Sequence, residues 1–65
     1  MLGRYRHYKG AEVEVTGLGK HSETLEEVVV YRHLDTGETW VRPKAMFLEE
    51  IEMNGVRQPR FRKLD

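Results

Sequence analysis

Cysteine is absent from this chain of 65 residues, proline occurs only twice, and there is no long apolar run. The lack of cysteine excludes disulfides, thiolate zinc sites and thiol nucleophiles, and it fits a reducing compartment. The longest apolar run, residues 28–31, is far shorter than the roughly 20 residues that cross a bilayer. Basic residues near the start interrupt any secretory signal. We therefore expect a cytoplasmic protein that does not associate with membranes.

An excess of one charge is also missing, because 11 Lys and Arg residues balance 11 Asp and Glu residues. This balance excludes a strongly basic nucleic-acid-binding tail and an acidic tail. The charges are nevertheless segregated along the sequence, since both ends of the chain are basic and residues 49–52 include three glutamates. A neutral total therefore leaves room for a local cationic patch.

The length limits the protein to one small domain, which we expect to span residues 1–65. A chain of this size buries only roughly 60% of its unfolded surface, so it has no room for separate catalytic and cofactor domains. Without disulfides, such a scaffold depends on tight aromatic packing or on oligomerisation, and we expect a monomer or a weak homodimer. The aromatic residues are spread along the chain, which predicts one shared core: Tyr5, Tyr8, Tyr31, Trp40, Phe47 and Phe61.

Short segments of strand-forming residues predict a mainly β protein. Residues 11–16 alternate apolar and polar side chains with the period of a half-buried strand, and residues 5–9 before them are expected to form a short extended arm. Residues 17–25 are expected to form a polar loop. Residues 27–34 are rich in β-branched and aromatic side chains and predict a central strand.

Two turn signals connect further strands. Residues 35–37, Asp-Thr-Gly, suit a three-residue hairpin turn that leads into a strand at residues 38–42. Residues 54–55, Asn-Gly, predict a type I′ turn between strands at residues 48–53 and 56–61. Both signals predict antiparallel neighbours.

One helical turn and one edge strand complete the predicted fold. Residues 43–47 begin with proline and continue with good helix formers, but they suffice for only a single turn of the tighter, three-residue kind. Pro59 marks the last strand as an edge strand. About five short strands with one short helical turn predict a small SH3-like β-barrel, with an OB-like barrel as the alternative.

Several chemical motifs fail on spacing or geometry. The glycine-rich residues 17–22 lack the glycine spacing and the following helix of a phosphate-binding loop, so a looser anion-binding nest and a plain turn remain as alternatives. His21, Ser22 and Glu23 are sequence neighbours, and neighbours on an extended loop cannot align as a hydrolase triad. The histidines share no metal-ligand spacing, so we predict no metal and no cofactor.

Aromatic and cationic side chains recur together in residues 5–9, 31–33, 40–43 and 60–61. Aromatic faces beside Arg and Lys stack bases and hold phosphates in proteins that bind single-stranded nucleic acids. The same residue types also form the core and the rim of a small barrel. Trp40 and Arg42 lie two positions apart on one predicted strand and therefore share a face, where Arg42 is able to bind an anion.

Four blocks of the chain match a known pattern. They are residues 3–10 (GRYRHYKG), residues 21–26 leading into residues 29–31, residues 40–43 (WVRP) with Met46 and Phe47, and Arg60 with Phe61. In this order they resemble the bacterial domain-of-unknown-function family 1653 over nearly the whole chain. The resemblance implies an SH3-type barrel and adds no assigned activity, substrate or cofactor. Either a structural polar network or a ligand would explain the polar residues of the motif, which include His7, Lys9, His21, Ser22, Glu23 and Arg42.

We therefore predict a non-catalytic binding module for an anionic ligand such as a nucleotide or single-stranded nucleic acid. In this prediction, the loop of residues 19–24 lies near the arm of residues 6–10 and the strand that carries Trp40 and Arg42. The predicted ligand-binding residues are Arg6, His7, Tyr8, Lys9, His21, Ser22, Glu23, Trp40 and Arg42. The alternative is a protein-interaction module that uses a sheet edge or an aromatic groove. A small hydrolase that uses His21 with Glu23 or His7 is a third and less favoured hypothesis.

Overall fold

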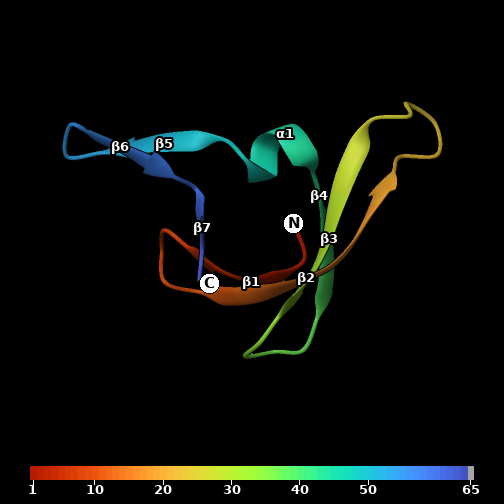
Figure 1. Ribbon diagram of the computed structural model, residues 1–65, viewed down its shortest axis with the longest axis horizontal. Coiled ribbons are helices and arrows are strands. Elements are labelled where there is room, and N and C mark those ends of the chain that lie inside the picture. The colour runs from red at the N-terminus through yellow and green to blue at the C-terminus, as the bar shows by residue number, and fades with distance from the viewer. Residues whose placement is uncertain (65) are drawn as a thin grey trace.

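The computed structural model describes residues 1–64, which form seven strands and one helical turn. In chain order the elements are β1 (Gly3–His7), β2 (Glu12–Lys20), β3 (Glu27–His33), β4 (Thr39–Pro43), α1 (Lys44–Phe47), β5 (Glu50–Met53), β6 (Val56–Pro59) and β7 (Phe61–Lys63). Figure 1 shows a curled sheet with a projecting hairpin of β5 and β6. The prediction of a mainly β protein is confirmed.

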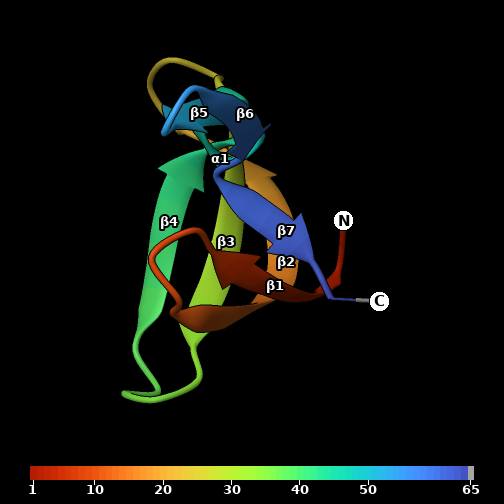
Figure 2. The same ribbon diagram turned by 90° about the vertical axis from the view of Figure 1, so that its left-hand side faces the viewer.

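The strands form two antiparallel sheets. The larger sheet has the order β4-β3-β2-β1-β7, and β5 and β6 pair separately. β3 lies inside the larger sheet and buries Val28 and Val29, as the prediction of a central strand requires. Figure 2 shows β4 and β7 at the edges of this sheet, with the hairpin above them. Within residues 1–64 the sheets are not closed into a barrel, so the predicted SH3-like barrel is not confirmed.

β2 is longer than the alternating pattern predicts, and the predicted polar loop at residues 17–25 is wrong for its first part. The β2–β3 register shifts between Val15 and Gly17, which is a β-bulge, and residues 17–20 then pair with residues 27–30. The side chains of Leu18 and Lys20 are exposed. Backbone hydrogen bonds to β3 keep residues 17–20 extended, and such bonds cannot be predicted from the pattern of side chains.

The predicted type I′ turn is confirmed by its backbone geometry. Asn54 and Gly55 have φ angles of 53° and 78°, which are the two positive values that a type I′ turn needs. The predicted hairpin turn at residues 35–37 is confirmed in position but is one residue longer, because the N–H of His33 donates to the Glu38 carbonyl and leaves residues 34–37 as the loop. Gly37 has a φ angle of 76°, and its N–H donates a hydrogen bond of 2.8 Å to the carbonyl of His33. Local sequence therefore determines both of these chain reversals.

The two ends of the chain form more strands than predicted. The predicted arm at residues 5–9 belongs largely to β1, and the predicted strand at residues 56–61 divides into β6 and β7, which lie in different sheets. The prediction of about five strands is therefore too low for the described residues. The chain bends at Arg60, whose N–H donates to the Glu49 carbonyl at 2.9 Å and whose carbonyl accepts from the Tyr8 N–H at 2.9 Å, so this residue lies where the two sheets meet.

The predicted helical turn at residues 43–47 is confirmed in position but not in type. The N–H of Leu48 donates to the carbonyl of Lys44 at 3.0 Å, which is the four-residue spacing of an α-helix. The turn is α1, and it buries Phe47 against the sheet. No helix among residues 1–64 has the length and apolar character needed to cross a membrane.

One core lies between α1 and the face of the larger sheet that carries Tyr5 and Tyr31, which we call the inner face. The Phe47 ring stacks on Phe61 with a centroid separation of 4.1 Å and meets Tyr5 edge-on at 5.2 Å. The predicted shared core is confirmed for these aromatic residues, whereas Trp40 is half exposed. The buried cluster consists of Tyr5, Val13, Val15, Val29, Tyr31, Phe47 and Phe61.

Candidate binding site

β4 presents Trp40 and Arg42 on the inner face. Trp40 lies opposite Tyr31 in the β3–β4 ladder, and Arg42 lies opposite Val29. Both of these β3 residues are buried in the core. Directly opposed residues project to the same side of a sheet, which confirms the prediction that Trp40 and Arg42 share a face. The Trp40 side chain is 50% exposed, so its ring is accessible beside the core.

Arg42 reaches across the molecule to the opposite edge of the larger sheet. Its Nε donates a hydrogen bond to the Tyr31 hydroxyl at 3.4 Å, and its guanidinium lies 5.7 Å from the centroid of the Phe61 ring on β7. No carboxylate among residues 1–64 forms an ion pair with Arg42. A guanidinium that rests on an aromatic face keeps the N–H groups of its edge for an anion.

His7 lies beside Phe61 at the end of β1. Its ring centroid is 4.9 Å from that of Phe61, and its Nδ1 accepts a hydrogen bond of 3.1 Å from the backbone N–H of Lys9. Burial lowers the pKa of His7 below its ordinary value of 6.5. Nearby positive charges lower this pKa further, and they belong to Arg42, Arg60, Lys9 and His33. The neutral imidazole with its proton on Nε2 is therefore favoured.

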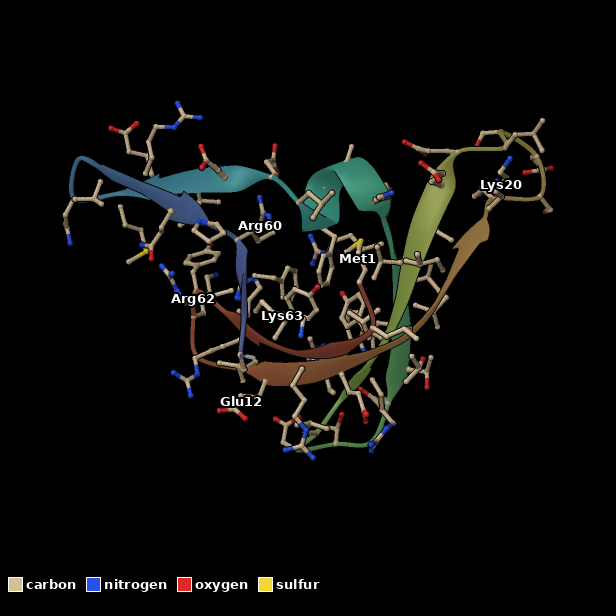
Figure 3. The ribbon with its side chains drawn as sticks, viewed as in Figure 1. Met1, Glu12, Lys20, Arg60, Arg62 and Lys63 are labelled. Carbon is tan, nitrogen blue, oxygen red and sulfur yellow. The ribbon has the colours of Figure 1, made fainter. Side chains whose placement is uncertain are left out.

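Two residues outside the predicted set complete the arrangement. His33 follows Tyr31 on the same face of β3, and its ring centroid lies 5.2 Å from that of Trp40. Its period-two spacing from Tyr31 is a signal that would have found it. Arg60 lies at the bend above β7, where Figure 3 labels it, and donates to a Glu49 carboxylate at 2.8 Å. Its buried Nε has no hydrogen-bond partner among residues 1–64.

These residues form one cationic and aromatic surface, which we call the inner-face cluster. Within residues 1–64, Arg42 and Lys9 lack carboxylate partners, while Glu49 pairs with Arg60. Glu38 accepts a hydrogen bond of 3.4 Å from the Trp40 indole. The surface thus combines an exposed ring for stacking with surplus positive charge for an anion. The inner-face cluster consists of His7, Lys9, His33, Trp40, Arg42 and Arg60.

Arg6 and Tyr8 lie next to the inner-face cluster. Arg6 alternates with the buried Tyr5 and projects from the other face, where its Nη2 donates to Glu12 Oε2 at 2.9 Å. The Tyr8 ring packs on His7 at a centroid distance of 4.5 Å. Both predicted residues are therefore near His7, although Arg6 faces away from the core.

The loop of residues 19–24 does not join the arm of residues 6–10, so this predicted convergence is wrong. Arg6 pairs with Glu12 at the start of β2, whereas Lys20 pairs with Glu27 at its end. Eight residues of extended strand separate these ends by roughly 26 Å. Figure 3 shows Lys20 at one end of the molecule and Arg62, the cross-strand neighbour of Arg6, toward the other. β2 continues as a paired strand where a loop is predicted.

His21 instead organises the turn between β2 and β3. Its Nδ1 accepts hydrogen bonds from the backbone N–H groups of Glu23 at 3.1 Å and Thr24 at 3.3 Å. The Thr24 hydroxyl in turn accepts from the N–H of Glu26 at 3.2 Å. Residues 17–20 of the predicted anion-binding nest belong to the β2–β3 ladder, and the N–H of His21 donates to the Glu26 carbonyl at 2.8 Å, which favours the structural explanation of this motif. Ser22 is exposed on the same turn.

The geometry also bears on the histidine hypotheses. His7 and His21 lie at opposite ends of β2, so they do not form the pair that the hydrolase hypothesis considered. Within residues 1–64, no group of three or more His, Asp or Glu side chains is arranged to hold a metal ion. Each of these two histidines has a structural hydrogen bond at Nδ1.

Comparison with known proteins identifies the family. A model described as a protein of unknown function (DUF1653) matches residues 3–63. The chain belongs to this family. Its structure is similar to the crystal structure of a DUF1653 protein from Bordetella bronchiseptica, with 34% identity and a TM-score of 0.90 over 98% of this chain and 86% of that chain. No curated protein matches. The resemblance inferred from the sequence blocks is confirmed.

Proposed function

We propose that this protein is a non-catalytic binding module for an anionic ligand that carries a flat ring, such as a nucleotide or single-stranded nucleic acid. The observation that supports the proposal is the inner-face cluster. There Arg42 carries no carboxylate partner among residues 1–64, and it shares a face with the half-exposed Trp40. A ring and a cation on one face are what a nucleotide base and its phosphate require.

Each part of the cluster has a separate role in this proposal. Trp40 stacks on the ring of the ligand, an interaction worth about 1–3 kcal/mol for a nucleic-acid base. Arg42 and Lys9 bind phosphate, and this contribution weakens as salt rises because bound counterions are released. His7 is neutral and donates from Nε2, because burial and then the surrounding positive charges lower its pKa.

Trp40 is the single tryptophan of the chain, so its fluorescence tests the proposal directly. The protein is titrated with a nucleoside monophosphate and with a short single-stranded oligonucleotide at low and at raised salt. We expect saturable quenching with an affinity that falls steeply with ionic strength. Wild-type protein that binds neither probe at low salt would sink the proposal.

Charge reversal locates the interaction. Arg42→Glu combined with Lys9→Glu is expected to abolish binding, because it replaces both phosphate-binding cations. The matched control is Lys20→Glu with Arg57→Glu, which changes the net charge equally at two exposed sites outside the cluster. Circular dichroism checks that both double variants fold. If Arg42→Glu disturbs the core, Lys9→Glu alone provides the test, because Lys9 lies in an exposed turn. This single variant should weaken binding.

A protein-interaction module is the second candidate, and the sheet edges favour it. Among residues 1–64, β4 and β7 each have a hydrogen-bonded neighbour strand on only one side, and Trp40 and Val41 on β4 are exposed. An extended peptide is able to add to such an edge through main-chain hydrogen bonds. Salt separates the candidates, because a peptide held at an edge responds little to ionic strength whereas phosphate binding responds strongly.

Three further properties remain proposals: an SH3-like barrel as the fold class, a cytoplasmic location, and a monomeric or weakly dimeric state. The curled order β4-β3-β2-β1-β7 supports the first, and comparing this order with known SH3-like barrels tests it. Sedimentation over a range of concentrations tests the third. Localisation of a tagged chain in cells tests the second.

A further inference from the structure

A pocket of about 140 Å³ lies where β1, β6 and β7 meet. It is distinct from the exposed surface of Trp40, and His7 is the residue that both regions share. The wall is made by Arg6, His7, Tyr8, Gln58, Pro59 and Arg62. None of these is acidic, so the pocket is electrically suited to an anion.

Two arginines in the wall of this pocket are neighbours on adjacent strands. Arg6 and Arg62 are direct partners in the β1–β7 ladder, where like charges destabilise a sheet. Arg6 uses one N–H group on Glu12 at 2.9 Å. Arg62 has no ion pair or side-chain hydrogen bond within residues 1–64. The pair therefore carries surplus positive charge that the fold does not neutralise.

Two of the three glutamates in residues 49–52, at the neighbouring hairpin, are already engaged. Glu49 pairs with Arg60 at 2.8 Å, and Glu50 pairs with Arg57 at 3.2 Å. Figure 3 shows Arg62 beside β7, below the hairpin and on the side of the molecule away from Lys20. The arginines of the basic C-terminal segment therefore differ in their contacts. Arg57 and Arg60 form ion pairs with glutamates of the hairpin region, whereas Arg62 lines the pocket.

We propose that this pocket binds a phosphate group between the guanidinium groups of Arg6 and Arg62. The inference rests on the proposed function, to which it adds a second phosphate subsite besides the one assigned to Arg42 and Lys9. Planar guanidinium forks match phosphate oxygens and form charge-assisted hydrogen bonds with them. A bound dianion would also offset the repulsion between the two arginines. This would explain why two like charges lie opposite each other on adjacent strands.

Inorganic phosphate and a nucleoside monophosphate are the probes, each titrated into the full chain at constant ionic strength and pH 7.5. Backbone amide NMR shifts at Tyr8 and Arg62 follow binding. We expect saturable shifts and an affinity about tenfold weaker or worse in Arg62→Gln, because a charge-assisted hydrogen bond is lost. The matched control is Arg4→Gln, on the same face of β1 but outside the pocket, with less than about twofold change.

Glu12→Gln tests the geometry from the other side. This variant removes the carboxylate that competes for Arg6, so phosphate is expected to bind several-fold more tightly. If Arg6 and Glu12 formed only a structural pair, the affinity for phosphate would not rise. The variant keeps the side-chain shape at an exposed ion pair, and thermal unfolding checks that it folds.

The outcomes separate this inference from the proposed function. Equal weakening in Arg4→Gln and Arg62→Gln, or no saturable shift with phosphate, overturns the pocket. Trp40 quenching by the oligonucleotide with an affinity that is unchanged in Arg62→Gln leaves the inner-face site standing and overturns the pocket as its second phosphate subsite. Phosphate binding that needs Arg62, without quenching of Trp40 by any nucleotide, supports the pocket and contradicts the proposed function. Tighter binding of the monophosphate than of free phosphate identifies a phosphate ester as the preferred source.

Discussion

His7 and His21 make the same local hydrogen bond in two different surroundings. Each Nδ1 accepts the backbone N–H two residues ahead, that of Lys9 in one turn and that of Glu23 in the other, both at 3.1 Å. His7 is partly buried, whereas His21 is exposed at the tip of the β2–β3 hairpin. Identical local chemistry therefore builds two turns, and only the turn at His7 lies within a candidate site.

The difference arises from what the fold places around each turn. Arg42 and Arg60 come from segments far along the chain, and both act on the pKa of His7. The His21 turn is instead held by bonds within residues 21–26. A shared histidine motif thus indicates a turn, and the neighbours supplied by tertiary packing decide whether that turn contributes to a binding surface.

The largest expected effect comes from removing the packing beneath His7. Phe61→Ala should lower the free energy of unfolding by about 3–5 kcal/mol, because Phe61 is buried against Phe47 and Tyr31. Urea denaturation followed by circular dichroism measures the change. Val56→Ala, at an exposed apolar residue, is the control and should change it by less than about 0.5 kcal/mol. If both variants lost a similar amount of unfolding free energy, the prediction that Phe61 is packed in the core and Val56 is not would be wrong.

A smaller effect is expected at the hairpin tip. His21→Ala leaves two backbone N–H groups without their acceptor and should cost about 1 kcal/mol, as the loss of a capping side chain does. His21→Asn should restore most of this stability, because its side-chain oxygen accepts the same bonds. Amide exchange at Glu23 and Thr24 reports the local change. Weakened nucleotide binding in a folded His21→Ala protein would place the tip in the site and contradict the comparison.

The smallest expected effect is a pH dependence that belongs to His7. Its folded-state pKa lies below the unfolded value of 6.5, so between these values the unfolded chain binds more protons. The stabilisation is fully present above pH 6.5 and is lost as pH falls through the lowered folded-state pKa. His7→Asn keeps an acceptor for Lys9 and should flatten this part of the curve, measured by urea denaturation from pH 8 to pH 4.5. An unchanged curve would show that His7 is not in the cationic surroundings described, and His21→Asn serves as the control.

Much of the fold follows from short sequence signals. The turns at residues 35–37 and 54–55 and the helical turn at residues 43–47 depend on φ preferences and local hydrogen bonds, so neighbouring residues suffice to predict them. The extension of β2 to Lys20 and the division of the last strand at Arg60 depend on which strand each segment pairs with. Side-chain alternation does not specify that pairing, and both features were missed.

The candidate site shows the same limit. Trp40 and Arg42 were placed on one face correctly, because strand alternation is a local property. His21, Ser22 and Glu23 were placed near the arm incorrectly, because loop closure over that distance is not encoded in their spacing. The sequence marks Arg62 only as part of the basic end of the chain and Arg60 also as a cation beside an aromatic residue, whereas their neighbours in the fold give the two arginines different roles.

The sequence by itself determined the family, the mainly β character, the hairpin turns and the residue types of a cationic, aromatic surface. These properties depend on motif order or on backbone preferences over a few residues. Only the tertiary structure decided which of those residues meet. β2 stays paired with β3 through residues 17–20, which places His21 far from His7. The bend at Arg60 brings Phe61 beside His7 and Arg42 and aligns Arg62 with Arg6. Pairing between strands that are distant in the sequence decides which side chains become neighbours. Every residue except proline offers the same backbone hydrogen-bonding groups, so the side chains alone do not reveal this pairing.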